Sequence, residues 1–116
     1  MITFNELKHD RRLLSQIDWD LTPQEAFEAY QIKSPQSWKH RALKEACFFQ
    51  VSVYQGASRV VLVKKTYKDS EEIAEAPAPE ELVHACLSQA PGGTTPHGAY
   101  PLDQGLRDWL QKELNI

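Results

Sequence analysis

Two aspartates separated by one residue are the plainest candidates for acid–base chemistry in this chain. Asp18 and Asp20 flank Trp19, shortly before Pro23, where a helix is expected to begin. A pair of carboxylates can divide the roles of general acid and general base, and the imidazole of His40 could share them. Aspartates are equally typical of a turn that leads into a helix. We expect the structural role, so no catalytic residue is assigned.

The cysteines and histidines give no stronger indication of a site. Cys47 lies in a strand-like run and Cys86 on the apolar stripe of a helix, so both are expected to be buried, unreactive thiols. His84 and Cys86 would lie about 200° apart around a helix and cannot face one metal ion. CxxC, HExxH and the glycine-rich phosphate-binding patterns do not occur in the sequence. We therefore expect no metal and no cofactor.

The richest constellation of binding residues is expected on a β-hairpin. Residues 46–55 and 58–67 are β-rich and meet at Gly56, which suits the first central position of a type II′ turn. That turn predicts a register with Val53 opposite Val60. One face of the hairpin is then apolar, and the other face is mixed. A slip by one residue would exchange the two faces.

The mixed face combines aromatic and basic side chains, and a tryptophan-containing loop precedes it. The candidate binding residues are Trp38, His40, Phe48, Tyr54, Arg59 and Lys65. Aromatic and basic groups on an open sheet are typical of surfaces that bind single-stranded nucleic acid. Two other interpretations are open: a helix covers this face, or a protein partner or a second copy of the chain binds there. Trp38 is expected to close the sheet against the helices.

The charges are distributed unevenly along the chain. The net charge is −3, but residues 1–68 carry a balance of +4 and residues 69–116 a balance of −7. Such asymmetry can mark a basic surface for an anionic partner, or it can mean that the two halves attract each other in the fold. We favour the second interpretation because the basic residues are dispersed. The acidic total also weakens the nucleic-acid interpretation.

Helices are expected on both sides of the hairpin in the sequence. Apolar spacing predicts a helix over 4–17, a second after the capping pair Thr22 and Glu25, and two more that begin after Pro79 and Asp103. A short third strand over 73–76 can extend the hairpin. The predicted class is therefore α+β, with a small antiparallel sheet flanked by two N-terminal and two C-terminal helices.

Size and composition fit a single compact domain over residues 1–116. The chain is 41% apolar, and no run of about 18 apolar residues occurs that could span a membrane. The first residues lack the long apolar core of a secretory signal. We expect a cytoplasmic protein.

Several short stretches, taken in order, resemble a small uncharacterised bacterial protein family of about this length. They are Ile17–Asp20, Thr22–Ala26, Trp38 with His40, Val61–Lys65, Pro79–Leu82, Gly98–Tyr100 and Trp109-Leu110. Relatives carry glycine and asparagine before the loop tryptophan, where this chain has Pro35-Gln36-Ser37. The family has no assigned activity, so the resemblance implies a shared fold and no site residues.

Together these observations predict a small soluble interaction domain without catalysis, which binds a protein partner or associates with itself. The alternative is binding of RNA or single-stranded nucleic acid through the mixed face. A weaker alternative is an enzyme that uses Asp18, Asp20 or His40.

Overall fold

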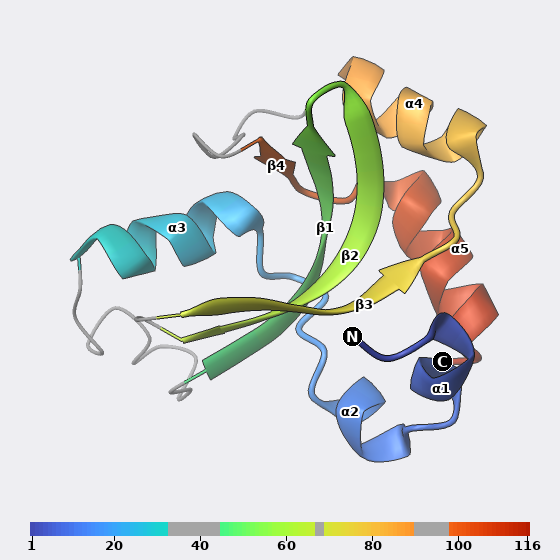
Figure 1. Cartoon of the computed structure of the whole chain (residues 1–116). Helices are drawn as coiled ribbons and strands as arrows, with labels where there is room; N and C mark the ends of the chain where they lie inside the picture. Colours follow the sequence, from blue (N-terminus) through green and yellow to red (C-terminus); the bar gives the residue numbers. More distant parts are fainter. Residues whose placement is uncertain (33–44, 67–68, 90–97) are drawn as a thin grey trace.

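The fold is an antiparallel sheet with helices on both of its faces. The computed structural model describes residues 1–32, 45–66, 69–89 and 98–116. The elements follow in the order α1 (Phe4–Lys8), α2 (Arg11–Ser15), α3 (Pro23–Ile32), β1 (Glu45–Tyr54), β2 (Ala57–Thr66), β3 (Ser70–Ala76), α4 (Glu80–Gln89), β4 (Ala99–Tyr100) and α5 (Gln104–Leu114). The sheet has four strands in the order β3-β2-β1-β4 (Figure 1). The predicted α+β class is confirmed.

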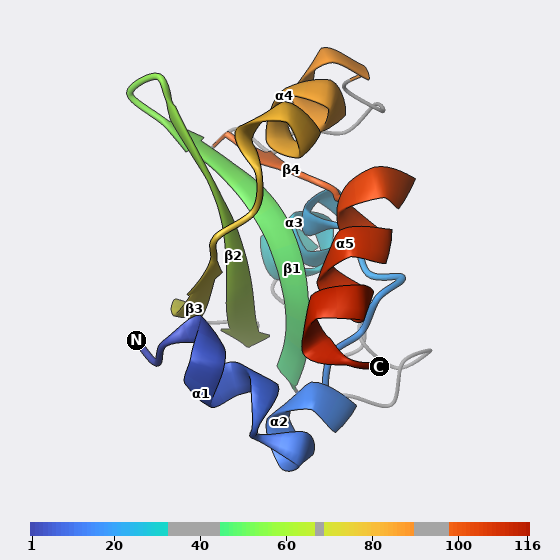
Figure 2. The same cartoon turned by 90° about the vertical axis from the view of Figure 1, so that its right-hand side faces the viewer.

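The sheet is covered unequally on its two faces. Helices α1, α4 and α5 lie on one side of it, and α3 lies on the other (Figures 1 and 2). The larger core cluster contains Leu7, Phe49, Leu62, Cys86, Leu106 and Leu110 among its buried members. The smaller cluster, beneath α3, consists of Leu21, Ala26, Ala46, Phe48, Val61 and Val63. None of the described helices is long and apolar enough to cross a bilayer.

The N-terminal region forms two short helices, so the prediction of one helix over 4–17 is wrong. Helix α1 ends at Lys8 with His9 as its C-cap, and the carboxylate of Asp10 accepts a hydrogen bond from the backbone N–H of Leu13 at 3.0 Å. Aspartate favours such a capping position over the interior of a helix. The chain therefore changes direction at Asp10 and begins a second helix, α2, at Arg11.

Two helices begin where the sequence predicts. The Glu25 N–H donates to Thr22 Oγ1 at 3.2 Å, and the Thr22 N–H donates to Glu25 Oε1 at 3.2 Å. This reciprocal capping box starts α3. Asp103 accepts a hydrogen bond from the Leu106 N–H at 2.9 Å and starts α5 in the same way. Both boundaries depend only on residues within one turn, which is why they were predictable.

The hairpin has a different turn from the one predicted. Gln55 and Gly56 are its central residues and have φ angles of 50° and 81°, as a type I′ turn requires. Val51, not Val53, therefore lies opposite Val60, so the predicted type II′ turn and its register are wrong. The register differs by an even number of residues, and every side chain keeps its predicted face.

The sheet is wider than the sequence predicts. β3 extends the third strand back to Ser70, and a register shift interrupts its pairing with β2 between Leu62 and Val63. β4 pairs Ala99 and Tyr100 with β1, where no strand is predicted from the sequence. A two-residue strand is too short to show an alternating pattern.

Candidate functional site

Helix α3 divides the mixed face of the hairpin into a covered half and an open half. Phe48 lies in the covered half, where it is 1% exposed and packs with the smaller core cluster. A buried ring cannot stack on a base or a partner side chain. The prediction that Phe48 is an accessible binding residue is therefore wrong, because burial of this large apolar group under a helix is more favourable than its exposure.

The open half lies toward the hairpin turn, and we call it the hairpin face. By the strand register it consists of Gln50, Ser52, Tyr54, Arg59, Glu72 and Glu75. Tyr54 is 69% exposed and lies next to the turn. Figure 2 shows that turn extending beyond the helices that cover the sheet. The hairpin face is the candidate interaction surface.

Arg59 lies in the middle of the hairpin face and is paired with acidic residues of β3. Its Nη2 donates to Glu72 Oε1 at 3.0 Å and to Oε2 at 3.1 Å, and its Nη1 lies 3.8 Å from Glu75 Oε2. All three side chains are partly exposed. A nucleic-acid phosphate would have to compete with two carboxylates for one guanidinium. The hairpin face thus carries charges of both signs and is not a basic surface.

Sequence reasoning missed Glu72 and Glu75 as part of this face. They are three positions apart, so regular alternation would place them on opposite sides of β3. The irregularity next to Ile73 adds one residue to β3, so that Glu72 pairs with Val63 and Glu75 with Val61. Both glutamates consequently point to the side of Arg59. No local signal in the sequence indicates where such a bulge falls.

The remaining predicted binding residues lie away from the hairpin face or outside the residues that the structure describes. Lys65 is opposite Ala46, at the end of β2 away from the hairpin turn. Burial lowers the pKa of its ammonium group, and the charge of Asp69 opposes that shift. The structure therefore separates Phe48 and Lys65 from Tyr54 and Arg59. Trp38 and His40 lie outside the described residues.

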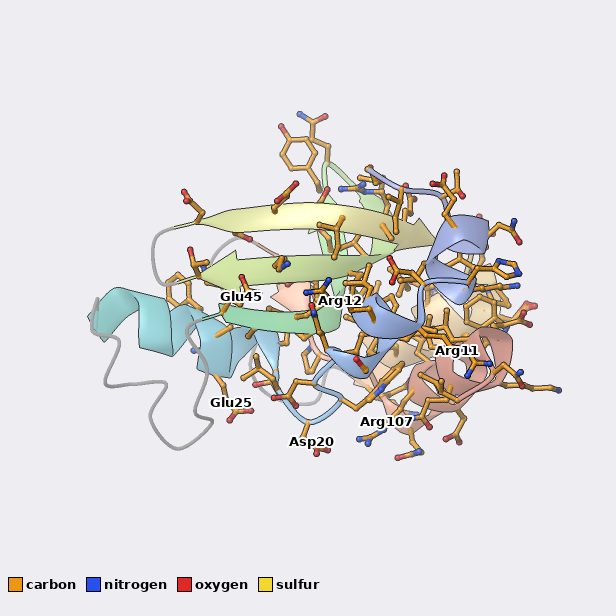
Figure 3. The ribbon with its side chains drawn as sticks, turned by 90° about the horizontal axis from the view of Figure 1, so that it is seen from below. Arg11, Arg12, Asp20, Glu25, Glu45 and Arg107 are labelled. Atoms are coloured by element: carbon orange, nitrogen blue, oxygen red, sulfur yellow. The ribbon has the colours of Figure 1, made fainter. Side chains whose placement is uncertain are left out.

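Asp18 and Asp20 both have structural partners. Asp18 Oδ1 accepts hydrogen bonds from the backbone N–H groups of Asp20 at 2.9 Å and Leu21 at 3.0 Å, which confirms its predicted role in a turn. Asp20 is 82% exposed and pairs with Arg107 of α5 at 3.3 Å; Figure 3 shows the two on the same side of the molecule. Trp19 packs on Phe49, with 5.6 Å between the ring centroids.

A small cavity of about 100 Å³ lies beside this turn, lined in part by Asp18, Trp19 and Arg107. The two carboxylates stabilise the turn and connect it to α5. Backbone N–H groups for Asp18 and the guanidinium of Arg107 for Asp20 are partners that suit a structural role.

The two thiols are buried, as predicted. Burial raises the pKa of the Cys47 thiol from its ordinary value of 9.0 to about 11, and the nearby charge of Lys64 offsets only part of this effect. Burial also raises the pKa of Cys86, whose sulfur lies 3.4 Å from the carbonyl oxygen of Pro101. A nucleophilic cysteine needs a lowered pKa and some exposure, and Cys47 has neither.

Alkylation of Cys47 in the folded protein should accordingly be slow. At pH 9 about 1% of this thiol is ionised, against about half in an unfolded chain. We expect iodoacetamide to modify it at least about tenfold more slowly in native buffer than in urea, as followed by peptide mass spectrometry. Equal rates in the two conditions would contradict the buried position.

The raised pKa of Cys47 also determines how the stability of the folded protein changes with pH. The folded state holds the proton of Cys47 more tightly than the unfolded state does. The stability that this thiol contributes is therefore complete below about pH 9 and is lost as the pH rises through about 11.

In the parts of the chain that the structure describes, no three His, Cys, Asp or Glu side chains gather closely enough to hold a metal ion. Comparison with protein-family models, with curated proteins and with solved structures finds no match for the chain. The resemblance to a bacterial family stays a prediction.

Proposed function

We propose that this protein is a small interaction domain without catalysis of its own, which associates with a second copy of itself through the hairpin face. The observation that carries the proposal is that α3 buries only half of the mixed face. The half nearest the turn keeps Tyr54 69% exposed beside a charged network. Tyrosine is enriched in protein interfaces because its rigid ring offers contact area and its hydroxyl can form hydrogen bonds.

The charges of the hairpin face suit a self-complementary contact. A two-fold symmetric dimer brings the same patch of both chains together. Arg59 of one copy can then approach Glu75 of the other, since Glu75 is 3.8 Å from its own arginine and its side chain is 47% exposed. Rim charge pairs of this kind favour the correct register more than they add affinity. Because Tyr54 is the exposed aromatic residue of the hairpin face, we expect a weak dimer, with a Kd of about 10 µM to 1 mM.

Binding of nucleic acid has less support than binding of protein. It requires bases to stack on Phe48, which is buried, and phosphates to displace Glu72 from Arg59. The enzyme alternative also has less support: Asp18 caps a turn, Asp20 is ion-paired, and Cys47 has a raised pKa. His40 lies outside the described residues.

Sedimentation velocity over a range of protein concentrations tests the proposal. The weight-average sedimentation coefficient of the wild type should rise with concentration, and Tyr54→Ala should weaken the dimer by about tenfold or more. Ile116→Ala is the matched control, because Ile116 is 57% exposed and lies outside the hairpin face. A wild-type chain that stays monomeric up to about 1 mM, or equal effects of both substitutions, would contradict self-association.

A further inference from the structure

A groove lies on the opposite side of the hairpin from the hairpin face. It has a cavity volume of about 650 Å³ and runs between the hairpin turn and the first turns of α4. Its lining includes Ser58 of β2, Ala78 of the connection after β3, and Glu80, Glu81 and His84 of α4. The hairpin turn and α4 lie at the same end of the molecule in both views (Figures 1 and 2).

One wall of the groove is an open strand edge at Ser58. The Thr66 N–H donates to the carbonyl oxygen of Asp69 at 2.9 Å, so Thr66 directs its backbone groups toward the β3 side. Alternate residues of a strand point their N–H and C=O groups the same way, and Ser58 therefore faces that side too.

Nothing in β3 pairs with Ser58. The last residue of β3, Ala76, lies opposite Val60, and Pro77 follows. A continued register would bring Ala78 opposite Ser58, but the Ala78 N–H instead donates to the carbonyl oxygen of Ala76 at 2.9 Å. Within the described residues, the N–H and C=O of Ser58 thus have no hydrogen-bond partner on the β3 side, where Ser58 lines the groove.

The other wall of the groove is acidic. Glu80 and Glu81 are both exposed in the first turn of α4, and His84 follows one turn later. The described part of the groove lining contains no lysine or arginine. Among the residues that the structure describes, neither glutamate forms an ion pair. The groove therefore offers two uncompensated carboxylates opposite an open strand edge.

We propose that this groove binds an extended, lysine- or arginine-containing segment of a partner protein. The segment adds to the sheet beyond the end of β3, where it exchanges two backbone hydrogen bonds with Ser58. Its basic side chains lie against Glu80 and Glu81, which sets the charge preference. The proposal is independent of self-association, because the hairpin face lies on the other side of the same two strands.

Fluorescence anisotropy with a labelled synthetic peptide of alternating lysine and valine tests the proposal. We expect saturable binding, weakened at least about tenfold by Glu80→Gln combined with Glu81→Gln. The matched control is Asp108→Asn combined with Glu113→Gln, which changes the net charge equally at two positions of α5 outside the groove lining. The control pair should bind the peptide as the wild type does.

Two altered peptides separate strand pairing from simple attraction of charges. A peptide with glutamate in place of lysine should not bind. A peptide N-methylated on the edge that pairs keeps its charge but loses the hydrogen-bond donors, so it should also lose binding. Equal binding of the N-methylated peptide, or equal weakening by the control pair, would overturn the proposal, as would no binding by the unmodified peptide. Tyr54→Ala should leave the affinity for the peptide unchanged. The experiments can therefore contradict peptide binding in the groove without contradicting self-association, and the reverse.

Discussion

Replacing Phe48 with alanine should lower the free energy of unfolding by about 3–5 kcal/mol. The ring is 1% exposed and is the largest buried side chain between the sheet and α3. Its removal deletes buried apolar area and leaves a cavity that Leu21 and Val61 can only partly fill. Urea denaturation followed by circular dichroism measures the loss as a shift of the midpoint at constant slope.

The matched control for this substitution is Tyr54→Ala on the same strand and the same face. Tyr54 is 69% exposed, so its replacement should change stability by no more than about 0.5 kcal/mol. A similar loss for both variants would mean that α3 does not divide the face as described. The contrast matters for function, because the covered half is core and only the open half is available to a partner.

Replacing Gly98 with alanine should destabilise the protein by about 2–4 kcal/mol, through backbone strain and a steric clash together. Gly98 has a φ of 75°, a conformation that disfavours a side chain, and its carbonyl oxygen accepts the Val53 N–H at 2.8 Å. An added Cβ would lie 2.6 Å from the Val53 carbonyl oxygen. Because the Cβ is fixed to one backbone and the oxygen belongs to the backbone paired with it, the pairing next to β4 has to loosen. Thermal and urea unfolding measure the effect.

Alanine substitutions at two other glycines separate the cost of backbone strain from the cost of the steric clash. Gly56 has a φ of 81° but nothing within 4 Å of an added Cβ, so Gly56→Ala should cost only about 1 kcal/mol. Gly105 is helical and its added Cβ would make ordinary contacts, so Gly105→Ala should stabilise the protein by about 0.4–1 kcal/mol. Losses that do not rank Gly98 above Gly56 would contradict the close approach of β4 to β1.

The division of the mixed face also decides which interactions are available to the protein. Residues that an open sheet would have joined into one aromatic and basic surface lie in two environments. Phe48 stabilises the core, whereas Tyr54 and Arg59 remain accessible among carboxylates. The accessible residues of the hairpin face suit contact with a protein surface that carries charges of both signs. The groove on the other side of the hairpin suits binding of a basic segment.

Local interactions were predictable from the sequence wherever the partners lie within one turn of chain. The capping boxes and N-caps at Thr22 and Asp103 depend on residues three positions apart. The faces of β1 and β2 were predictable because side-chain alternation survives an even shift of register. The α+β class followed from these elements. The sequence also indicated that both cysteines are buried, because Cys47 lies in a strand-like run and Cys86 on the apolar stripe of a helix.

By itself, then, the sequence determined the capped helix starts and the side of the hairpin on which each residue lies, and it showed that CxxC, HExxH and glycine-rich phosphate-binding patterns do not occur. The tertiary structure alone decided that α3 covers Phe48, that a bulge brings Glu72 and Glu75 to Arg59, and that β4 forms at all. The reason is physical: these features depend on contacts between segments far apart in the chain. Their energies come from burial and strand pairing, which no local pattern of residues records.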